Sequence, residues 1–331
     1  MNAERPAPPE QGRGALSAFK IDVIVPVRNG EKYIAEALGS VLAQIYLPEK
    51  IIVVNDGSTD ATESVVLEVK SRSLIPVIYL KNLGSGRCSA RNCGLRSVTS
   101  EYVAFLDADD VWLPDKLAEQ VRVFENSPFR KLGVVYCDYA VIDEHGNKAA
   151  AAHVIHPGRE TRGDVFLKLL GGNLISGSCS AALVKRECFT AAGYFDESLN
   201  AAEDWDMWLR IAKIFQFDYS DKTLVKLRIH PDNTQHDTVH MLDNEILFFN
   251  KWSGSFDGRA WHRWGKNLMC RVVNALPDLG VYNKVRAEFS ESSRERLFSA
   301  CFGSMRLYFI AAVWYIRTKR AFLRVFNFGK A

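Results

Sequence analysis

Short apolar runs alternate with polar segments over the first third of the chain. Residues 21–25, 51–54 and 102–106 are apolar except for Asp22, and the first two segments are rich in Val and Ile. Such runs are typical of strands that are buried on both faces of a sheet. They predict three strands of an open α/β sheet, connected by segments with helical and turn character.

Each of these predicted strands ends in a polar loop, at residues 26–30, 55–60 and 107–110. Ligands of open α/β sheets bind outside the carboxyl ends of the strands, so the three loops are expected to line one crevice. Asp56 can accept hydrogen bonds there from a nucleobase or a ribose hydroxyl. Alternatively it caps the next helix, a task that Ser58 or Thr59 can equally perform.

The third loop carries Asp107, Asp109 and Asp110 within four positions. Carboxylates this close repel one another unless a cation neutralises them. Hard divalent cations such as Mg²⁺ and Mn²⁺ bind through one or two carboxylates together with substrate phosphates. Asp107 and Asp109 are therefore candidates for a metal–phosphate site. A solvated acidic turn would be the better explanation of an isolated Asp-x-Asp pair, so the metal–phosphate interpretation depends on the neighbouring motifs.

A glycine-rich segment, residues 82–95, lies between the second and third loops. It opens a predicted helix, whose first N–H groups can bind phosphate. A dinucleotide fingerprint is excluded, because Ser89 stands where the third glycine is required. Arg87 and Arg91 lie four positions apart, hence on one helical face. They can reach a diphosphate or the acidic loop, and a structural ion pair is the alternative.

These stretches together resemble the family 2 glycosyltransferases, which are inverting enzymes with the nucleotide-diphospho-sugar transferase fold called GT-A. The matching motifs are residues 24–29, 53–60, 82–95 and 105–112. The resemblance covers about residues 20–230 and implies a mixed, mostly parallel central sheet flanked by helices.

The resemblance also implies a donor site at the residues that match the family's motifs: Pro26, Val27, Asn29, Asp56, Asn82, Arg87, Arg91, Asp107 and Ala108. In such a site Asp56 contacts the nucleobase. Asp107 and Asp109 face the ribose and the metal that bridges the two phosphates.

A second acidic cluster, Glu203, Asp204 and Asp206, opens a predicted amphipathic helix. The helix dipole favours acidic residues in a first turn, so capping explains part of the cluster. Transfer to a hydroxyl by a single displacement needs a general base, and a carboxylate suits that task. The cluster resembles the family's Glu-Asp motif, which makes Asp204 the first candidate for the base and Glu203 the second.

His230 follows a short predicted strand that begins at Lys222. A single histidine is usually structural. In the family, however, a strand followed by Arg-x-His often lies against the diphosphate, which implies His230 as a third ligand of Mn²⁺ or Mg²⁺ beside Asp109. Neutral imidazole suits this role. A Gly- and Ser-rich loop, residues 173–180, precedes a predicted strand at 181–184 and is a candidate for the acceptor site.

Length and composition predict about two domains, because the chain has 331 residues of which 47% are hydrophobic. Residues 1–19 are expected to form a flexible tail without the apolar segment of a secretory signal. Residues 20–240 are the predicted GT-A catalytic domain, and 241–331 a basic, mostly helical C-terminal region. The seven cysteines, at spacings unlike a zinc or disulfide framework, predict reduced thiols in a cytoplasmic protein.

Charge is distributed unevenly along the chain. Residues 251–331 contain 15 Lys and Arg against 5 Asp and Glu, a balance of +10, which leaves 27 against 34, or −7, for residues 1–250. Basic and aromatic residues interleave over 305–328, where the uninterrupted apolar run has ten residues and a membrane span needs about 20. This segment predicts peripheral contact with the cytoplasmic face of a membrane. Packing on the catalytic domain or on a dimer partner is the alternative, and no nucleic acid is expected.

The sequence thus predicts an inverting glycosyltransferase. It would move a sugar from a nucleotide-diphospho-sugar, by resemblance a UDP-sugar, to a hydroxyl of a glycan or lipid-linked acceptor in cell-envelope polysaccharide synthesis. A sugar nucleotidyltransferase would carry a Gly-rich, basic signature near the first strand, where residues 26–29 read Pro-Val-Arg-Asn. A non-catalytic nucleotide-sugar-binding module would have lost key carboxylates, yet Asp107, Asp109, Glu203 and Asp204 are all present.

Overall fold

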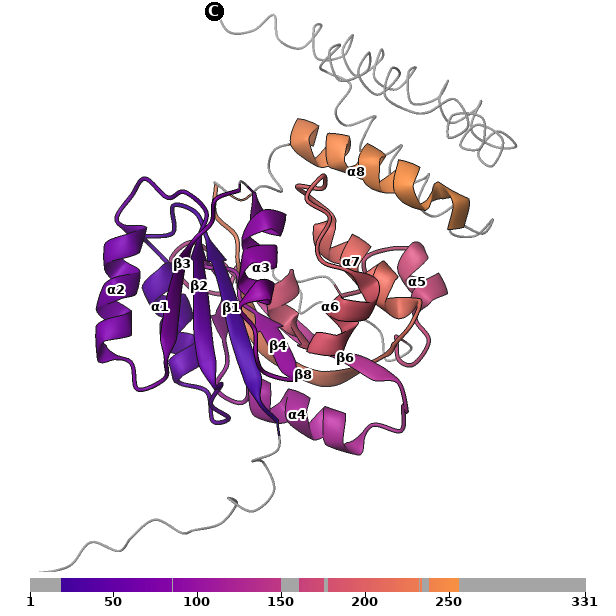
Figure 1. The fold of residues 1–331 in the computed structure, drawn as a ribbon, viewed down its shortest axis with the longest axis horizontal. Coiled ribbons are helices and arrows are strands. Elements are labelled where there is room, and N and C mark those ends of the chain that lie inside the picture. The colour runs from indigo at the N-terminus through magenta and orange to yellow at the C-terminus, as the bar shows by residue number, and fades with distance from the viewer. Residues whose placement is uncertain are drawn as a thin grey trace, which may run out of the picture. The chain divides into compact units, whose positions relative to one another are not determined.

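The computed structural model describes residues 19–84, 86–149, 161–175, 178–231, 233 and 238–255 (Figure 1). The predicted tail, apart from its last residue, and the basic segment 305–328 lie outside this part of the chain. Within the described part, no helix has both the length and the apolar character needed to cross a membrane.

Chain contacts divide the protein into two compact units. The first consists of Met1–Phe166 and Leu174–Pro231, and the second of Leu167–Asn173 and Asp232–Ala331. All the candidate site residues belong to the first unit. The domain boundaries inferred from the sequence remain predictions.

Eight strands form one sheet in the order β3-β2-β1-β4-β7-β6-β8-β5. Their bounds are β1 (Ile21–Val27), β2 (Lys50–Asn55), β3 (Val77–Lys81), β4 (Tyr102–Phe105), β5 (Val111–Trp112), β6 (Leu132–Ile142), β7 (Ala182–Lys185) and β8 (Gln216–Arg228). The pairs β3–β2, β2–β1, β1–β4 and β6–β8 are parallel, and β4–β7, β7–β6 and β8–β5 are antiparallel. The predicted α/β fold with a mixed, mostly parallel sheet is confirmed.

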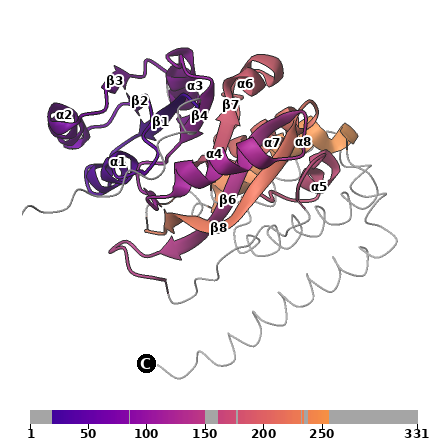
Figure 2. The same ribbon diagram turned by 90° about the horizontal axis from the view of Figure 1, so that it is seen from below.

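The helices of the described part are α1 (Ile34–Leu42), α2 (Thr62–Arg72), α3 (Arg87–Arg96), α4 (Lys116–Asn126), α5 (Phe166–Leu170), α6 (Arg186–Ala192), α7 (Glu203–Ala212) and α8 (Thr238–Trp252). Figure 2 shows α1 and α3 on opposite sides of the parallel strands. Val23 and Val25 of β1 share a core with Ile34 of α1. On the other face, a Cβ at Gly94 of α3 would lie 2.6 Å from Ile24 Cγ2, so glycine permits this close packing. Burial on both faces explains why consecutive residues from Val23 to Val25 are apolar.

The carboxyl ends of β2, β1 and β4 lie next to one another, because these strands are parallel neighbours. The loops that follow them carry Asp56, Asn29 and Asp107. The three polar loops therefore lie at the same end of neighbouring strands, while the crevice that they are expected to line stays a prediction.

Strand β8 differs from its prediction, since it begins at Gln216 rather than at Lys222. Its first half contains Asp218, which resembles a loop residue in the sequence. In the structure Asp218 is buried, accepts a hydrogen bond from Ser127 and pairs with Arg162. The pairing of β8 with β6 also contains register shifts, which interrupt any regular alternation.

Candidate active site

The loops after β1 and β2 are joined by Asn29. Its backbone N–H donates to Ser58 Oγ at 2.9 Å, and its Oδ1 accepts from the Thr59 N–H at 2.8 Å. Asn29 has φ 52°, a left-handed conformation that asparagine tolerates better than most residues. Pro26 and Val27 end β1 directly before this cross-link. The predicted donor residues of the first strand therefore border the second loop.

Asp56 holds the glycine-rich loop. Its Oδ1 accepts from Asn82 Nδ2 at 2.7 Å, and its Oδ2 accepts from the Gly86 N–H at 2.8 Å. The start of α2 is held instead by Asp60, whose Oδ1 accepts from the Thr62 N–H at 3.1 Å. Asp56 thus orders the loop that leads into α3.

The acidic loop after β4 is anchored through Asp110. Ser180 Oγ donates to Asp110 Oδ2 at 2.6 Å, and the Arg228 N–H donates to Asp110 Oδ1 at 3.1 Å. The Asp107 N–H in turn donates to Ser180 Oγ at 3.0 Å. Burial, and then the charges of Asp109 and Asp107, raise the pKa of Asp110 well above its ordinary value. Asp110 therefore acts as an internal support of the loop.

The two predicted metal ligands lie together. His230 Nε2 is 3.1 Å from Asp109 Oδ2, and the two side chains are 12% and 30% exposed. Ala108, next to Asp109, packs against the apolar core beside Gly30. The described residues contain no group of three or more His, Cys, Asp or Glu side chains that could hold a metal. An oxygen and an imidazole nitrogen still fit a divalent cation whose other ligands are phosphate oxygens and water.

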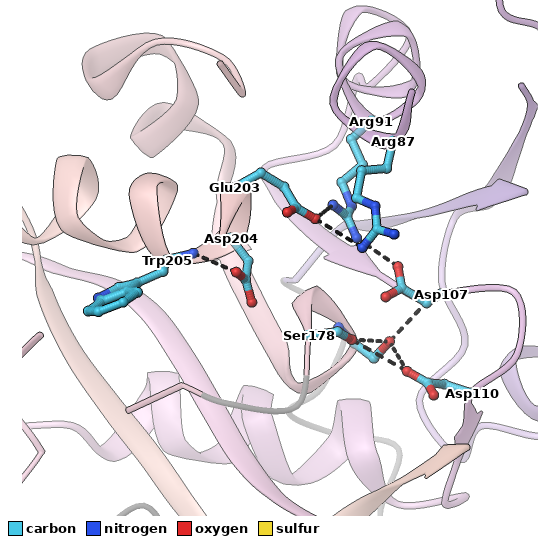
Figure 3. A network of polar contacts seen from close by, with 9 residues as sticks. Arg87, Arg91, Asp107, Asp110, Ser178, Glu203, Asp204 and Trp205 are labelled. Atoms are coloured by element: carbon cyan, nitrogen blue, oxygen red, sulfur yellow. Dashed lines mark hydrogen bonds and ion pairs between the residues drawn. The ribbon is translucent and has the colours of Figure 1, made fainter. Parts of the chain in front are cut away.

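A buried arginine connects the two acidic segments (Figure 3). Arg91 Nη2 donates to Asp107 Oδ1 at 2.8 Å, and Arg91 Nη1 donates to Glu203 Oε1 at 2.7 Å. Arg87 Nη1 is 3.6 Å from the same glutamate oxygen. The Arg91 side chain is 2% exposed and that of Arg87 is 39% exposed. The predicted helical pair therefore meets the same carboxylate, with Arg91 inside the protein and Arg87 partly in solvent.

The charges of this cluster support one another. Burial alone would raise the pKa of Asp107 and of Glu203, but Arg91 and Arg87 outweigh it, so both pKa values lie below the ordinary range. Burial would lower the pKa of Arg91, but the acidic groups around it raise that pKa well above its ordinary value. All three groups are charged at neutral pH.

The three carboxylates that open α7 have different surroundings. Glu203 is buried against Arg91, and Asp206 is buried with its Oδ2 2.9 Å from Arg210 Nε. Asp204 is only partly buried, and its Oδ1 accepts from the Trp205 N–H at 2.7 Å. Figure 3 shows Asp204 beside Glu203, at the same end of α7 as the Arg91 ion pairs.

Two supports of the site were not identified from the sequence. Ser178, with φ 59°, and Ser180 lie in the loop predicted to shape the acceptor site, a role that stays a prediction, and Ser180 contacts the acidic loop. Arg228 is 2% exposed, and its guanidinium donates to Glu36 Oε2 at 2.6 Å and to Asp109 O at 2.9 Å. A Ser-x-Ser pattern and the Arg-x-His strand were visible signals, but their partners lie far away in the sequence.

Comparisons with known proteins show which family the chain belongs to. The family described as Glycosyl transferase family 2 matches residues 22–190. The chain is 34% identical over 237 residues to an uncharacterized glycosyltransferase of Rickettsia prowazekii (strain Madrid E), which covers 71% of this chain and 70% of the relative. It is 29% identical over 198 residues to the UDP-Glc:alpha-D-GlcNAc-diphosphoundecaprenol beta-1,3-glucosyltransferase WfgD of Escherichia coli, covering 60% of this chain and 72% of WfgD.

Solved structures share the fold. TarS 1–349 of S. aureus in complex with UDP-GlcNAc superposes with a TM-score of 0.58 at 17% identity, covering 85% of this chain and 79% of TarS. The mannosyltransferase PcManGT of Pyrobaculum calidifontis, in complex with GDP-Man and Mn²⁺, gives a TM-score of 0.56 at 20% identity, covering 89% of this chain and 86% of PcManGT. Both neighbours are GT-A glycosyltransferases, so the predicted fold is confirmed. The chain belongs to glycosyl transferase family 2.

Proposed function

We propose that this glycosyltransferase transfers a sugar from a nucleotide-diphospho-sugar to an acceptor hydroxyl with inversion at the anomeric carbon. One observation carries the proposal. The loop after β4, which matches the family's donor motif, is joined through Arg91 to Glu203, the residue directly before Asp204. A donor-binding loop and a candidate base therefore belong to one connected site.

The donor is bound by the loops at the carboxyl ends of the parallel strands and by the start of α3. A carboxylate accepts about four hydrogen bonds, so Asp56 retains capacity for a nucleobase N–H beside its bonds to Asn82 and Gly86. The partly exposed Arg87 is the cation placed to bind the diphosphate. The dipole of α3, which begins at Arg87, favours the same anion at its N-terminus.

Asp109 and His230 would hold a Mn²⁺ or Mg²⁺ ion. When bound, the ion neutralises the charge that develops on the departing nucleoside diphosphate. Asp109 would supply the hard oxygen ligand that both ions prefer, and His230 a neutral imidazole nitrogen beside it. The contact between the two side chains supports this assignment, because His230 lies beside Asp109 of the acidic loop although the two are far apart in the sequence.

Asp204 is the general base of the proposed mechanism. Glu203 is a poor base, because its Oε1 accepts from Arg91 and lies 3.6 Å from Arg87, and both cations favour its ionised form. Asp204 is partly exposed at the same helix end. It takes the proton of the acceptor hydroxyl while the hydroxyl oxygen attacks the anomeric carbon opposite the leaving diphosphate. An α-linked donor would then give a β-glycoside.

The named relatives narrow the substrates. WfgD is named for UDP-Glc and a diphosphoundecaprenol-linked acceptor, and the TarS structure contains UDP-GlcNAc. They favour a UDP-sugar donor and a glycan or lipid-linked acceptor in cell-envelope polysaccharide synthesis. Because the PcManGT structure contains GDP-Man, a GDP-sugar is the alternative donor to be tested.

Calorimetric titration with UDP, GDP and dTDP, each with Mn²⁺ and with EDTA, tests the proposal. We expect saturable binding of one nucleotide that is lost in EDTA. The nucleotide that binds then identifies the sugar donors to be assayed. Absence of binding to all three by the folded protein would overturn the proposed donor site.

The variant Asp109→Asn tests the metal assignment in the same titration. We expect this variant to lose the Mn²⁺-dependent part of nucleotide binding while its far-UV circular dichroism spectrum stays unchanged. Asp221→Asn is the matched control, because Asp221 is an exposed aspartate of β8 outside the proposed site. Full Mn²⁺-dependent binding by Asp109→Asn would remove Asp109 from the site.

A further inference from the structure

Helix α7 is fastened to the donor side of the site at its first residue. Glu203 accepts from Arg91, which also donates to Asp107 in the donor loop. Glu203 and Arg91 are 112 positions apart in the sequence, and Arg91 and Asp107 are 16 apart. Three segments of the chain are thus connected through one guanidinium, whose two terminal nitrogens each bind a different carboxylate.

Stability alone does not account for this arrangement. Three charged groups with little exposure must be desolvated, and apolar residues of similar volume often stabilise a protein as well as a buried ion cluster does. What the guanidinium fork does provide is fixed geometry, because two directed hydrogen bonds set the distance between the carboxylates. The ring of Phe195, 5.6 Å from the Arg91 guanidinium, packs against the arginine.

The backbone before Glu203 also requires such an anchor. Ala202 has φ 59° and ψ 16°, a left-handed conformation that is unfavourable for a residue with a Cβ. Conformations of this kind persist where the surrounding structure imposes them. In the described part of the chain, the non-glycine residues with positive φ are Asn29, Ser178 and Ala202, and all three lie in loops at this site.

We propose that Arg91 and Glu203 are positioning residues that couple occupancy of the donor site to the placement of Asp204. Asp107 fixes the guanidinium on the donor side, the guanidinium fixes Glu203, and Glu203 fixes the turn that carries Asp204. A nucleotide that immobilises the donor loop thereby also orders the first turn of α7. This inference rests on the proposed function, and it assigns Glu203 a role other than the base.

Hydrogen–deuterium exchange with the full chain tests the coupling. The probe is whichever of UDP, GDP or dTDP binds in the titration, with Mn²⁺. In the unmodified protein, we expect the nucleotide to slow amide exchange in residues 203–209 by about fivefold or more, the lower end of ordinary coupling between sites. In Glu203→Gln we expect nucleotide affinity within about threefold of normal, with the slowing in α7 reduced to less than about twofold.

Turnover gives a second readout that a purely structural role would not produce. Using the sugar donor of the same nucleotide with water as acceptor, we expect Glu203→Gln to lower kcat by about tenfold while the donor KM changes by less than about threefold. Arg91→Lys keeps the charge but loses the fork, so it should behave in the same way. Glu68→Gln, in an exposed ion pair with Arg72 on α2, is the matched control and should keep both readouts.

The outcomes separate the inference from the function on which it rests. If the unmodified protein binds none of the three nucleotides, the proposed function fails. If it binds one of them but α7 exchange is unchanged, or the Glu203→Gln variant retains the full response, the coupling is overturned and the donor site stands. Should Glu203→Gln fail to fold, Arg91→Lys and Ala202→Gly supply the test, because glycine removes the strained Cβ and should weaken the response.

Discussion

The acidic loop after β4 and the acidic start of α7 each carry three carboxylates within four positions, yet the structure treats their members differently. In each segment the first carboxylate, Asp107 or Glu203, pairs with the buried Arg91. The second, Asp109 or Asp204, remains partly exposed. The chemistry we propose uses these second members, one for the metal and one for the acceptor proton.

The third members show the largest contrast. Asp206 is buried and has a cation beside it, since Arg210 Nε lies 2.9 Å from its carboxylate. Asp110 is equally buried, but it accepts hydrogen bonds from the Ser180 hydroxyl and the Arg228 backbone N–H. The charge of Asp206 is balanced by Arg210, whereas burial and neighbouring acids raise the pKa of Asp110 and favour its protonated form. A carboxylate's role therefore follows from what surrounds it more than from its place in an acidic run.

The largest effect is expected from Asp204→Asn, which removes the proposed base and keeps the size of the side chain. We expect kcat to fall by about 10²–10⁴-fold, the usual contribution of general base catalysis, with donor binding retained. Steady-state assays combined with nucleotide titration measure both quantities. The loss should exceed that of Glu203→Gln, and the opposite ranking would exchange the roles of the two residues.

Asp206→Asn tests the pairing in α7. It leaves the Arg210 cation, whose side chain is 17% exposed, without its carboxylate. We expect the free energy of unfolding to fall by about 2–4 kcal/mol, because a charge left unpaired in the interior is costly. Urea denaturation measures this loss. Asp206→Leu with Arg210→Met should recover most of it, and an unchanged midpoint in Asp206→Asn would show that the pair contributes little.

Much of the donor side of the site, which consists of the parallel strands and the loops that follow them, could be predicted from the sequence. Residues 51–54, and residues 21–25 apart from Asp22, are apolar because both faces of β1 and β2 are buried, and the polar residues that follow them mark the strand ends. Since parallel neighbours bring their carboxyl ends together, the sequence could predict that the loops with Asp56 and Asp107 lie at the same end of the sheet.

The other half depends on pairings that no local pattern contains. Asp218 resembles a loop residue but lies inside β8, because Arg162 and Ser127 satisfy its carboxylate. The helical spacing of Arg87 and Arg91 predicted a shared face, and both do approach Glu203. The burial of Arg91 and its ion pair with Asp107 could not be predicted from this spacing, because they depend on how α3 packs on the sheet.

A buried cation extends the comparison to the opposite charge. Lys116 is fully buried, with its Nζ 2.8 Å from Gln120 Oε1 and 3.9 Å from the centre of the Trp112 ring. Burial lowers the pKa of Lys116 from 10.5 to about 8. Between these two values the unfolded chain binds more protons than the native protein, so the free energy of unfolding rises with pH over this window.

Lys116→Met should therefore stabilise the protein at pH 7, by about 1–3 kcal/mol, because a similar apolar stem replaces a desolvated charge. The gain should shrink as the pH rises from 8 to 10.5. Urea denaturation across this range measures both effects, with Lys70→Met, an exposed position on α2, as the control. A pH-independent difference would show that Lys116 does not titrate in this window.

The smallest effect is expected at Asp110, where the Asp→Asn substitution meets a carboxylate that accepts from a hydroxyl and a backbone N–H. Asp110→Asn keeps an oxygen to accept from the Arg228 N–H and an amide to donate to Ser180 Oγ. The free energy of unfolding in EDTA should change by less than about 1 kcal/mol near pH 5, whereas Asp110→Ala, which leaves both partners unsatisfied, should cost about 1–3 kcal/mol.

Because the pKa of Asp110 is raised on folding, the native protein loses stability as the pH climbs above the ordinary carboxyl range. Asp110→Asn should therefore gain on the unmodified protein between pH 5 and pH 8. If it instead costs as much as Asp206→Asn, Asp110 is ionised in the native state and the contrast between the two segments disappears.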